Sequence, residues 1–264
     1  MISMLRPVWA YRGFVLGNVK REFQLKYRNS LLGAAWTVLQ PLAMILVYTV
    51  IFSQIMRAKL PGVDSTFGYS IFLCSGILTW GLFSEITTRS QNMFLENANL
   101  LKKLTFPRLC LPVTVVGTGL LNFSIVFGLF SLFLLITGNF PGLVAVALVP
   151  LLIILLILAV GLGMILGVLN VFFRDVGQFY SIFITFWFWL TPIVYPPSIL
   201  PDRLKFMIGL NPLSSWMAAT QGVLVQGEWP HWVSLLYPLA LGLILYACGL
   251  HLFRKCAGEM VDEL

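Results

Sequence analysis

The run LVAVALVPLLIILLILAVGLGMILGVLN, Leu143–Asn170, carries no charged residue over 28 positions. A helix needs about 20 consecutive apolar residues to cross the hydrocarbon core of a bilayer. This run is therefore long enough to span a membrane as one helix. We predict that the chain is an all-α integral membrane protein.

The composition of the whole chain favours the same class. Of its 264 residues, 59% are hydrophobic and 10% are charged, and the mean hydropathy is +0.91. Soluble domains contain about 25% charged residues, so one soluble core could not bury this much apolar surface. The net charge of +7 does not indicate nucleic acid binding, because the basic residues flank apolar runs and do not form one patch.

Further apolar runs on both sides of the first predict more spans. We expect a single membrane domain over residues 1–264, and the second and fifth of its spans are short for a full crossing. The six predicted spans are residues 31–52, 69–84, 109–136, 143–170, 179–195 and 232–253.

The distribution of Lys and Arg predicts the orientation. With the N-terminus in the cytosol, thirteen of the seventeen basic residues fall in cytosolic segments and four fall in outer loops. Basic residues are enriched on the cytosolic side of membrane proteins. We therefore expect both termini in the cytosol.

Residues 196–230, between the fifth and sixth spans, require a separate interpretation. The stretch Phe206–Gly227 is apolar enough to be a seventh span, but that would move the basic residues near the C-terminus to the outer side. Asn211 followed by Pro212 is a favourable helix start. We predict a re-entrant helix–turn–helix that enters the outer leaflet and returns. Because irregular backbone at that depth must be buried or line a wet cavity, we expect it near a transport pathway.

The N-terminal residues 1–30 are too polar to span. Val15 and Val19 lie on one side of a helix and Arg21 and Arg28 on another, which predicts a basic amphipathic helix in the membrane interface. An anchor that only sets the topology fits this pattern equally well.

A second amphipathic segment lies between the second and third spans, in ENANLLKKLTFPR. We predict a short helix that begins near Asn92 and ends before Pro107. Its apolar face needs a partner, which is either the lipid interface or a soluble protein. This face contains Phe94, Ala98, Leu101 and Leu104.

The chain shows no motif that would supply energy or catalysis. It contains no nucleotide-binding loop, and His231 and His251 have no partner at metal-ligand spacing. An ion-coupled transporter would bury several ionisable groups, yet Glu85 is the only acid close to the interior of a predicted span. A membrane enzyme acting on lipid-linked sugar would need catalytic acids or metal ligands at a leaflet. Both alternatives are weaker than a non-enzymatic permease driven by a separate ATPase.

Four segments resemble, in this order, the membrane subunit of ABC-2 type exporters of cell-surface polysaccharide, in the branch that exports O-antigen. They are REFQLKYRNSLLGAAWTVLQPL, ENANLLKKLTFPR, NVFFRDVGQF, and TPIVYP followed by LNPLSSW. The resemblance covers nearly the whole chain, but it separates O-antigen exporters less well from exporters of capsule or teichoic acid.

The resemblance implies a homodimer in the bacterial inner membrane that binds two cytosolic ATPase subunits. It implies a substrate linked to undecaprenyl pyrophosphate, in contact with membrane lipid. No cofactor is expected in this chain, because the partner ATPase would bind ATP and Mg.

Roles for residues follow from the resemblance. Six residues of the two cytosolic loops are expected to couple the permease to the ATPase: Phe94, Glu96, Asn97, Leu101, Arg174 and Asp175. Asp175 fits equally well as a charge at a helix N-terminus, where the dipole contributes about 0.3–1 kcal/mol, and Arg174 as an anchor.

Two further sets are assigned. Arg21 and Arg28 are expected to recruit the pyrophosphate, because guanidinium groups form paired hydrogen bonds to phosphate. A periplasmic gate is expected at Asn211, Pro212 and Trp216.

The window Phe179–Trp189 has seven aromatic residues in eleven positions. Rings stack on the apolar faces of sugars without fixing one register, so a helical face of rings suits a sliding polysaccharide. An aromatic belt at the membrane interface is the alternative. We assign five rings of the first and fifth spans to the channel: Trp36, Tyr48, Tyr180, Phe183 and Trp187.

Overall fold

The computed structural model describes residues 9–26, 32–55, 67–103 and 107–263, and these contain helices and no strand. The helices are α2 (Arg12–Lys26), α3 (Trp36–Thr49), α4 (Gly68–Glu96), α5 (Ala98–Lys103), α6 (Cys110–Ile136), α7 (Leu148–Phe172), α8 (Asp175–Leu190), α9 (Asp202–Gly209), α10 (Pro212–Gln221), α11 (Leu236–Cys256) and α12 (Glu259–Glu263).

Short 3-10 or π turns extend several helices or stand between them. They are η1 (Gly33–Ala35) and η2 (Val50–Ile55) around α3, η3 (Gly142–Ala147) before α7, η4 (Pro197–Ile199) before α9, η5 (Gly222–Gln226) after α10 and η6 (Trp232–Leu235) before α11.

Four helical stretches are long and apolar enough to cross a membrane. They are Gly68–Glu96, Cys110–Ile136, Gly142–Phe172 and Trp232–Cys256. A fifth stretch, Trp36–Phe52, is apolar but shorter. The prediction of an all-helical membrane fold is confirmed at this level.

The second predicted span was too short. The helix that contains this span, α4, continues beyond residue 84 to Glu96 and covers 29 residues. Its polar second half is buried against other helices: Ser90 and Gln91 are each 3% exposed. The predicted helix start near Asn92 is therefore wrong, since Asn92 lies within α4 and α5 follows after Asn97.

The fifth predicted span has shifted boundaries. Helix α8 begins at Asp175 and ends at Leu190 instead of covering residues 179–195. Thr191, which precedes Pro192, is extended with φ −103° and ψ 134°. A residue before proline is driven out of the helical region by steric clash, so the helix stops there.

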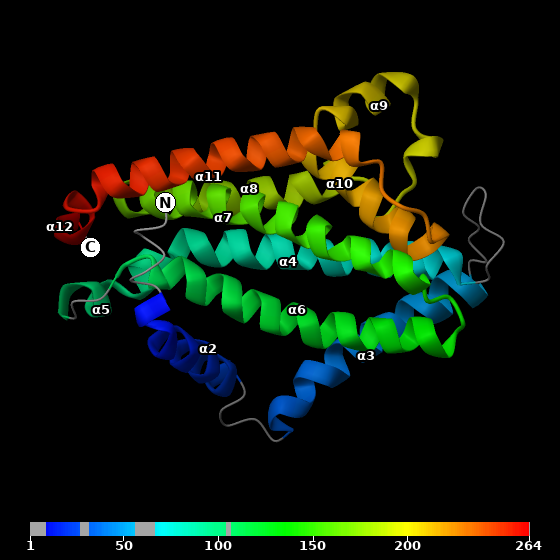
Figure 1. Cartoon of the computed structure of the whole chain (residues 1–264), viewed down its shortest axis with the longest axis horizontal. Coiled ribbons are helices and arrows are strands. Elements are labelled where there is room, and N and C mark those ends of the chain that lie inside the picture. The colour runs from blue at the N-terminus through cyan, green and yellow to red at the C-terminus, as the bar shows by residue number, and fades with distance from the viewer. Residues whose placement is uncertain (1–8, 27–31, 56–66, 104–106, 264) are drawn as a thin grey trace.

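Helix α4 is the centre of the bundle. Its most apolar window is 67% buried, against 22–39% for the other three long stretches. Figure 1 shows α4 between α6 and α7, with α11 outside α7. The outer helices therefore bury a smaller share of their apolar residues than α4 does.

Helix α7 approaches its neighbours closely through glycines. A Cβ at Gly161 would lie 2.4 Å from the backbone nitrogen of Tyr246 in α11, and one at Gly163 would lie 2.6 Å from Cβ of Ser90 in α4. Small residues that let helix backbones meet are typical of membrane interfaces. These contacts fix α4, α7 and α11 as one unit.

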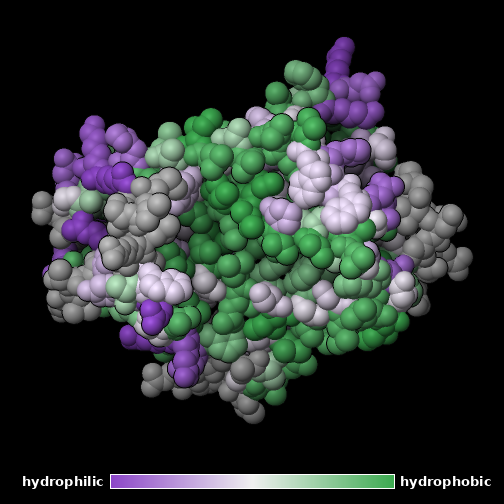
Figure 2. Space-filling view, in the orientation of Figure 1, coloured by the Kyte–Doolittle hydropathy of each residue, from purple (hydrophilic) through white to green (hydrophobic). Residues whose placement is uncertain are grey.

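The two ends of the bundle differ. Figure 1 shows α5 and α12 together at one end, which we call the α5 end, and α9 at the opposite end, the α9 end. Hydrophilic residues gather at both ends in Figure 2, with an apolar band between them. This is the surface pattern of a protein that spans a bilayer.

Candidate functional site

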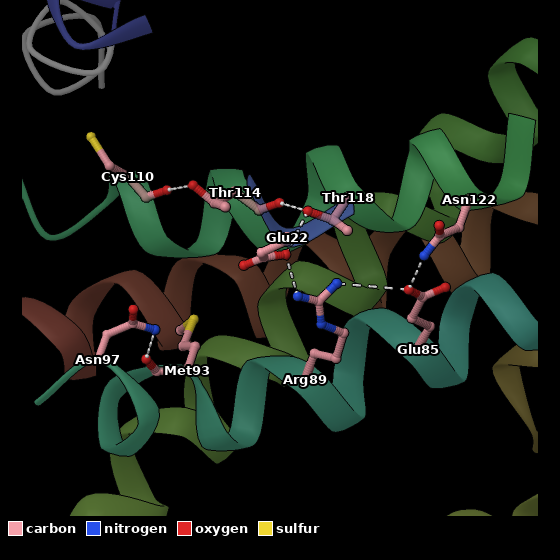
Figure 3. Close-up of polar contacts among 9 residues, drawn as sticks. All are labelled: Glu22, Glu85, Arg89, Met93, Asn97, Cys110, Thr114, Thr118 and Asn122. Atoms are coloured by element: carbon pink, nitrogen blue, oxygen red, sulfur yellow. Dashed lines mark hydrogen bonds and ion pairs between the residues drawn. The ribbon is translucent and has the colours of Figure 1, made fainter. Parts of the chain in front are cut away.

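Helices α4 and α6 lie side by side and face each other with side chains at four-residue spacing (Figure 3). This spacing places each set on one face of its helix. We call the residues drawn there the polar ladder, which consists of Glu85, Arg89 and Met93 on α4, Asn97 directly after α4, and Cys110, Thr114, Thr118 and Asn122 on α6. Met93 and Cys110 take part through their backbone carbonyl oxygens.

Glu22 of α2 joins the two sides of the ladder. Its Oε2 lies 2.5 Å from Nη2 of Arg89 and accepts a hydrogen bond of 2.8 Å from the hydroxyl of Thr118. The side chains of Arg89 and Glu22 are 32% and 36% exposed. A charge-assisted contact of this kind is stronger than a neutral hydrogen bond, so it fixes α2 against the bundle.

Glu85 extends the network one turn along α4. Its Oε1 lies 3.7 Å from Nη1 of Arg89 and accepts a hydrogen bond of 2.6 Å from Nδ2 of Asn122. Arg89 therefore contacts two carboxylates.

The sequence analysis noted Glu85 but missed Glu22, Arg89, Thr118 and Asn122 as one network. The available signals were an acid and a base four residues apart in an apolar helix, and polar residues at the same spacing in the next helix.

A pocket of about 300 Å³ opens between α2, α4, α5 and α6. Its lining includes Arg21, Glu96 and Asn97, which the sequence analysis had assigned to two different roles. The amide of Asn97 donates to the carbonyl oxygen of Met93 at 2.8 Å. Arg28 lies outside the described residues, so its position relative to the pocket is not defined.

The apolar face expected on the first cytosolic helix is not free. Phe94 is fully buried, stacked on Phe253 of α11 with ring centroids 5.7 Å apart, and Leu101 is 8% exposed in the same cluster as Met260. The expectation that this face lacks a partner in the chain is wrong. Leu104 lies outside the described residues, and the exposed side chains of this region are Glu96, Asn99 and Lys102.

Arg174 and Asp175 lie at the turn between α7 and α8, and both are exposed. Asp175 is the first residue of α8. Asn170, which is 2% exposed, holds this turn, because its Oδ1 accepts from the backbone of Gly177 at 2.9 Å while its Nδ2 donates to the carbonyl oxygen of Gln91 at 2.9 Å. The turn is thereby tied to α4, a link that the sequence analysis missed.

Two of the rings assigned to the channel face the protein core. Tyr180 is 2% exposed and its hydroxyl donates to Oγ1 of Thr87 at 2.6 Å. Trp187 is half-buried and meets Phe83 edge-on, with centroids 5.3 Å apart. Both rings therefore lie against α4 in the subunit.

The opposite side of α8 is exposed and aromatic. We call it the outer face of α8, and it consists of Phe179 (71% exposed), Ile182 (55%), Phe183 (42%), Phe186 (65%) and Trp189 (60%). Phe183 is the one assigned ring that belongs to both sides, because it stacks with Phe179 and also contacts Trp187. The rings presented outward are therefore largely different from those predicted.

The assigned rings of α3 differ from each other. Trp36 is 47% exposed. Tyr48 is half-buried and lines an apolar cavity of about 160 Å³ with Gln40 and Pro41.

The residues assigned to the gate are joined to α8. Asn211 caps α10 by accepting from the backbone of Leu213 at 3.1 Å, and Pro212 follows as predicted. The Oδ1 of Asn211 also accepts from Nε1 of Trp187 at 2.9 Å. Trp216 is 1% exposed and donates to the carbonyl oxygen of Leu151 at 2.7 Å. These contacts fasten α10 to the ends of α8 and α7.

The sequence of this chain matches a known family of membrane proteins. Residues 15–225 match the family model described as ABC-2 type transporter. The chain belongs to the ABC-2 type transporter family. The match runs from α2 to η5, so the polar ladder, the pocket and α8 all lie in the part of this ABC-2 chain that the family model covers.

Curated relatives of this ABC-2 chain are permease proteins. It is 32% identical to the O-antigen export system permease protein RfbA of Klebsiella pneumoniae, over 92% of each chain, and 30% identical to the RfbA of Myxococcus xanthus over the whole of both. The polysialic acid transport protein KpsM of Escherichia coli is 26% identical over 92% of this chain and 93% of its own length. In the part of the chain that the structure describes, no three His, Cys, Asp or Glu residues are grouped as metal ligands.

Proposed function

We propose that this chain is the channel-forming permease subunit of an ATP-driven exporter that moves lipid-linked O-antigen polysaccharide across the bacterial inner membrane. The observation that carries the proposal is the identity of 30–32% over 92–100% of this chain to permeases named for O-antigen export. The capsule-type relative, at 26% identity, is more distant.

In this proposal the subunit has six spans and both termini in the cytosol. The four long stretches and Trp36–Phe52 would be five of the spans, and α8 the sixth. With 16 residues α8 is about 24 Å long, shorter than the ~30 Å hydrocarbon core. The re-entrant helices α9 and α10 would complete this crossing on the periplasmic side, and basic residues at the α5 end would stay in the cytosol.

We further propose that two copies of the chain enclose the polysaccharide channel. The outer face of α8 and the exposed residues of α3, such as Trp36, would line it. The polymer would enter attached to undecaprenyl pyrophosphate, with Arg21 at the pocket and Arg28 contacting the phosphates. Asn211, Pro212 and Trp216 would hold the periplasmic end in position.

Two cytosolic ATPase subunits would supply the energy, and they would bind the ATP and Mg. The ATPase subunits would dock at the α5 end. This placement is supported by the exposed polar residues of α5 and of the Arg174–Asp175 turn, which lie over buried side chains. Phe94 and Leu101 would brace α5 from within instead of contacting the ATPase.

The proposed function is tested with the purified complex of this chain and its ATPase in lipid nanodiscs. We expect lipid-linked O-antigen to stimulate ATP hydrolysis. Lipid-linked capsular polysaccharide and teichoic acid serve as comparison substrates. A complex that responds to one of these and not to O-antigen would replace the proposed substrate.

A separate prediction concerns the docking place. Lys102→Glu on α5 is expected to weaken co-purification of the ATPase about tenfold, because reversing an exposed interfacial charge turns attraction into repulsion. Lys205→Glu on α9, at the opposite end, is the matched control and should leave co-purification unchanged. Equal retention of the ATPase by both variants would exclude α5 from the contact.

A further inference from the structure

The pocket at the α5 end brings Arg21 together with the carboxylates of Glu22 and Glu96 and with apolar side chains. Its volume is about 300 Å³, and both polar and apolar side chains line it. Arg21, Glu22, Glu96 and Asn97 supply the polar groups, together with Asn18 and Thr114. The apolar groups are Leu25, Met93, Leu100, Leu111 and Val115.

One of the side chains that line this pocket, Glu22, forms the ion pair with Arg89. Glu22 and Met93 line the pocket, whereas Arg89 stands one helical turn further along α4. In Figure 3 the carboxylate of Glu22 lies between α4 and α6 and contacts Arg89. A molecule in the pocket therefore lies beside Arg21 and Glu22, and Arg89 is reached through its ion-pair partner Glu22.

Helix α2 depends on this contact for its position. Its apolar attachment to α6 consists of Val15 and Val19 around Cys110, with Phe14 and Leu121 packed against them. Glu22 adds contacts to both α4 and α6. Release of Glu22 would remove these polar contacts with α4 and α6 and leave α2 packed on α6 through the apolar cluster.

We propose that the pocket binds the phosphate headgroup of a lipid, and that Glu22 occupies the place of this phosphate until the lipid arrives. The Glu22–Arg89 pair is then a latch. A phosphate that enters displaces the carboxylate of Glu22 from the guanidinium of Arg89, binds Arg89 and Arg21, and frees α2.

The charges favour displacement of the Glu22 carboxylate by a phosphate over binding of a phosphate beside it. Arg89 already contacts Glu22 and Glu85, so an added anion would meet two carboxylates around one guanidinium. A diphosphate carries more charge than one carboxylate, and guanidinium groups bind phosphate through two parallel hydrogen bonds. The inference rests on the proposed function for the identity of the lipid, but the latch itself is defined by residues of this chain.

The latch predicts that substitutions of Glu22 and of Arg89 have opposite effects on the response to lipid-linked glycan. Glu22→Gln removes the competing anion, so the complex should respond to lipid-linked glycan at a concentration about 5- to 50-fold lower. Arg89→Gln removes the receiving guanidinium and should abolish the response. If the ion pair only stabilises the fold, both variants should lose the response to lipid-linked glycan. A change of this response in the same direction in both variants would overturn the proposal. Lys20→Gln, an exposed charge of α2 outside the pocket, is the control.

A cross-linking measurement does not depend on ATP hydrolysis. A Cβ at Gly117 of α6 would lie 3.1 Å from Cγ2 of Val19, close enough for Val19→Cys and Gly117→Cys to form a disulfide. The pair is placed in a Cys110→Ala background, because Cys110 adjoins Val19. Ligand binding that frees α2 should slow disulfide formation severalfold, and Glu22→Gln should slow it without ligand.

The probes identify the source of the phosphate. Disulfide formation is compared in the phosphate-free detergent dodecyl maltoside, in the same detergent with phosphatidylglycerol added, and in the same detergent with lipid-linked glycan added. A response to phosphatidylglycerol alone assigns the site to membrane phospholipid and leaves the latch in place even if the proposed substrate is wrong. Disulfide formation that none of these lipids alters would reject the site.

Discussion

Gly161→Ile is expected to prevent the folded subunit from accumulating in the membrane. A Cβ at this position would lie 2.4 Å from the backbone nitrogen of Tyr246 and 2.7 Å from the carbonyl carbon of Leu245. Gly249 has the reciprocal restriction, since its Cβ would be 2.9 Å from the carbonyl oxygen of Gly161. Overpacking costs about 1–3 kcal/mol where side chains can rearrange. Here two helix backbones would have to separate, so we expect a larger loss.

The measurement is the yield of monodisperse protein after membrane extraction, together with its thermal unfolding midpoint. Gly128→Ile is the matched control, because Gly128 is an exposed helical glycine of α6 with no atom within 4 Å of a built Cβ. The control should give the yield of the unmodified protein. A normal yield for Gly161→Ile would mean that α7 and α11 are packed differently.

The apolar helices could be predicted because hydropathy alone defines them. The run that begins at Leu143 is covered by η3 and α7, within a few residues of the predicted boundaries. The second half of α4 could not be predicted in this way. Its residues 85–97 include charged and amide side chains, which read as a loop unless their partners on other helices are known.

The face that a membrane helix turns to the core is difficult to predict when all its sides are apolar. Tyr180 is held by Thr87, 93 residues earlier in the chain, and Arg89 is held by Glu22, 67 residues earlier. Neither pairing has a local signal. In a soluble helix the polar side would mark the exposed face. Helix α8 has aromatic residues on both sides, so the sequence predicted that aromatic residues line a face of this helix but not which face is directed outward.

The outer face of α8 carries the second large expected effect. Replacing Phe179, Phe183 and Phe186 together with leucine is expected to reduce export of lipid-linked polysaccharide on the order of 100-fold. This estimate assumes about 1 kcal/mol for each aromatic contact, with tenfold for every 1.4 kcal/mol. The measurement is the rate at which polysaccharide reaches the cell surface, relative to the amount of assembled complex.

Leucine distinguishes a channel from a lipid-facing belt. It keeps these positions apolar, so lipid contact and insertion are retained, while the flat surface that stacks on sugar is lost. The three rings are 42–71% exposed. Replacing Phe183 removes its ring contact with Trp187, but the hydrogen bonds of Tyr180 to Thr87 and of Trp187 to Asn211 remain, so the complex should still assemble. Phe140→Leu with Trp232→Leu, two aromatic residues that are 41% and 46% exposed elsewhere on the molecule, provides the matched control and should export normally. Normal export by the α8 variant as well would assign its outer face to the lipid, and the polysaccharide path would then have to be sought along α3.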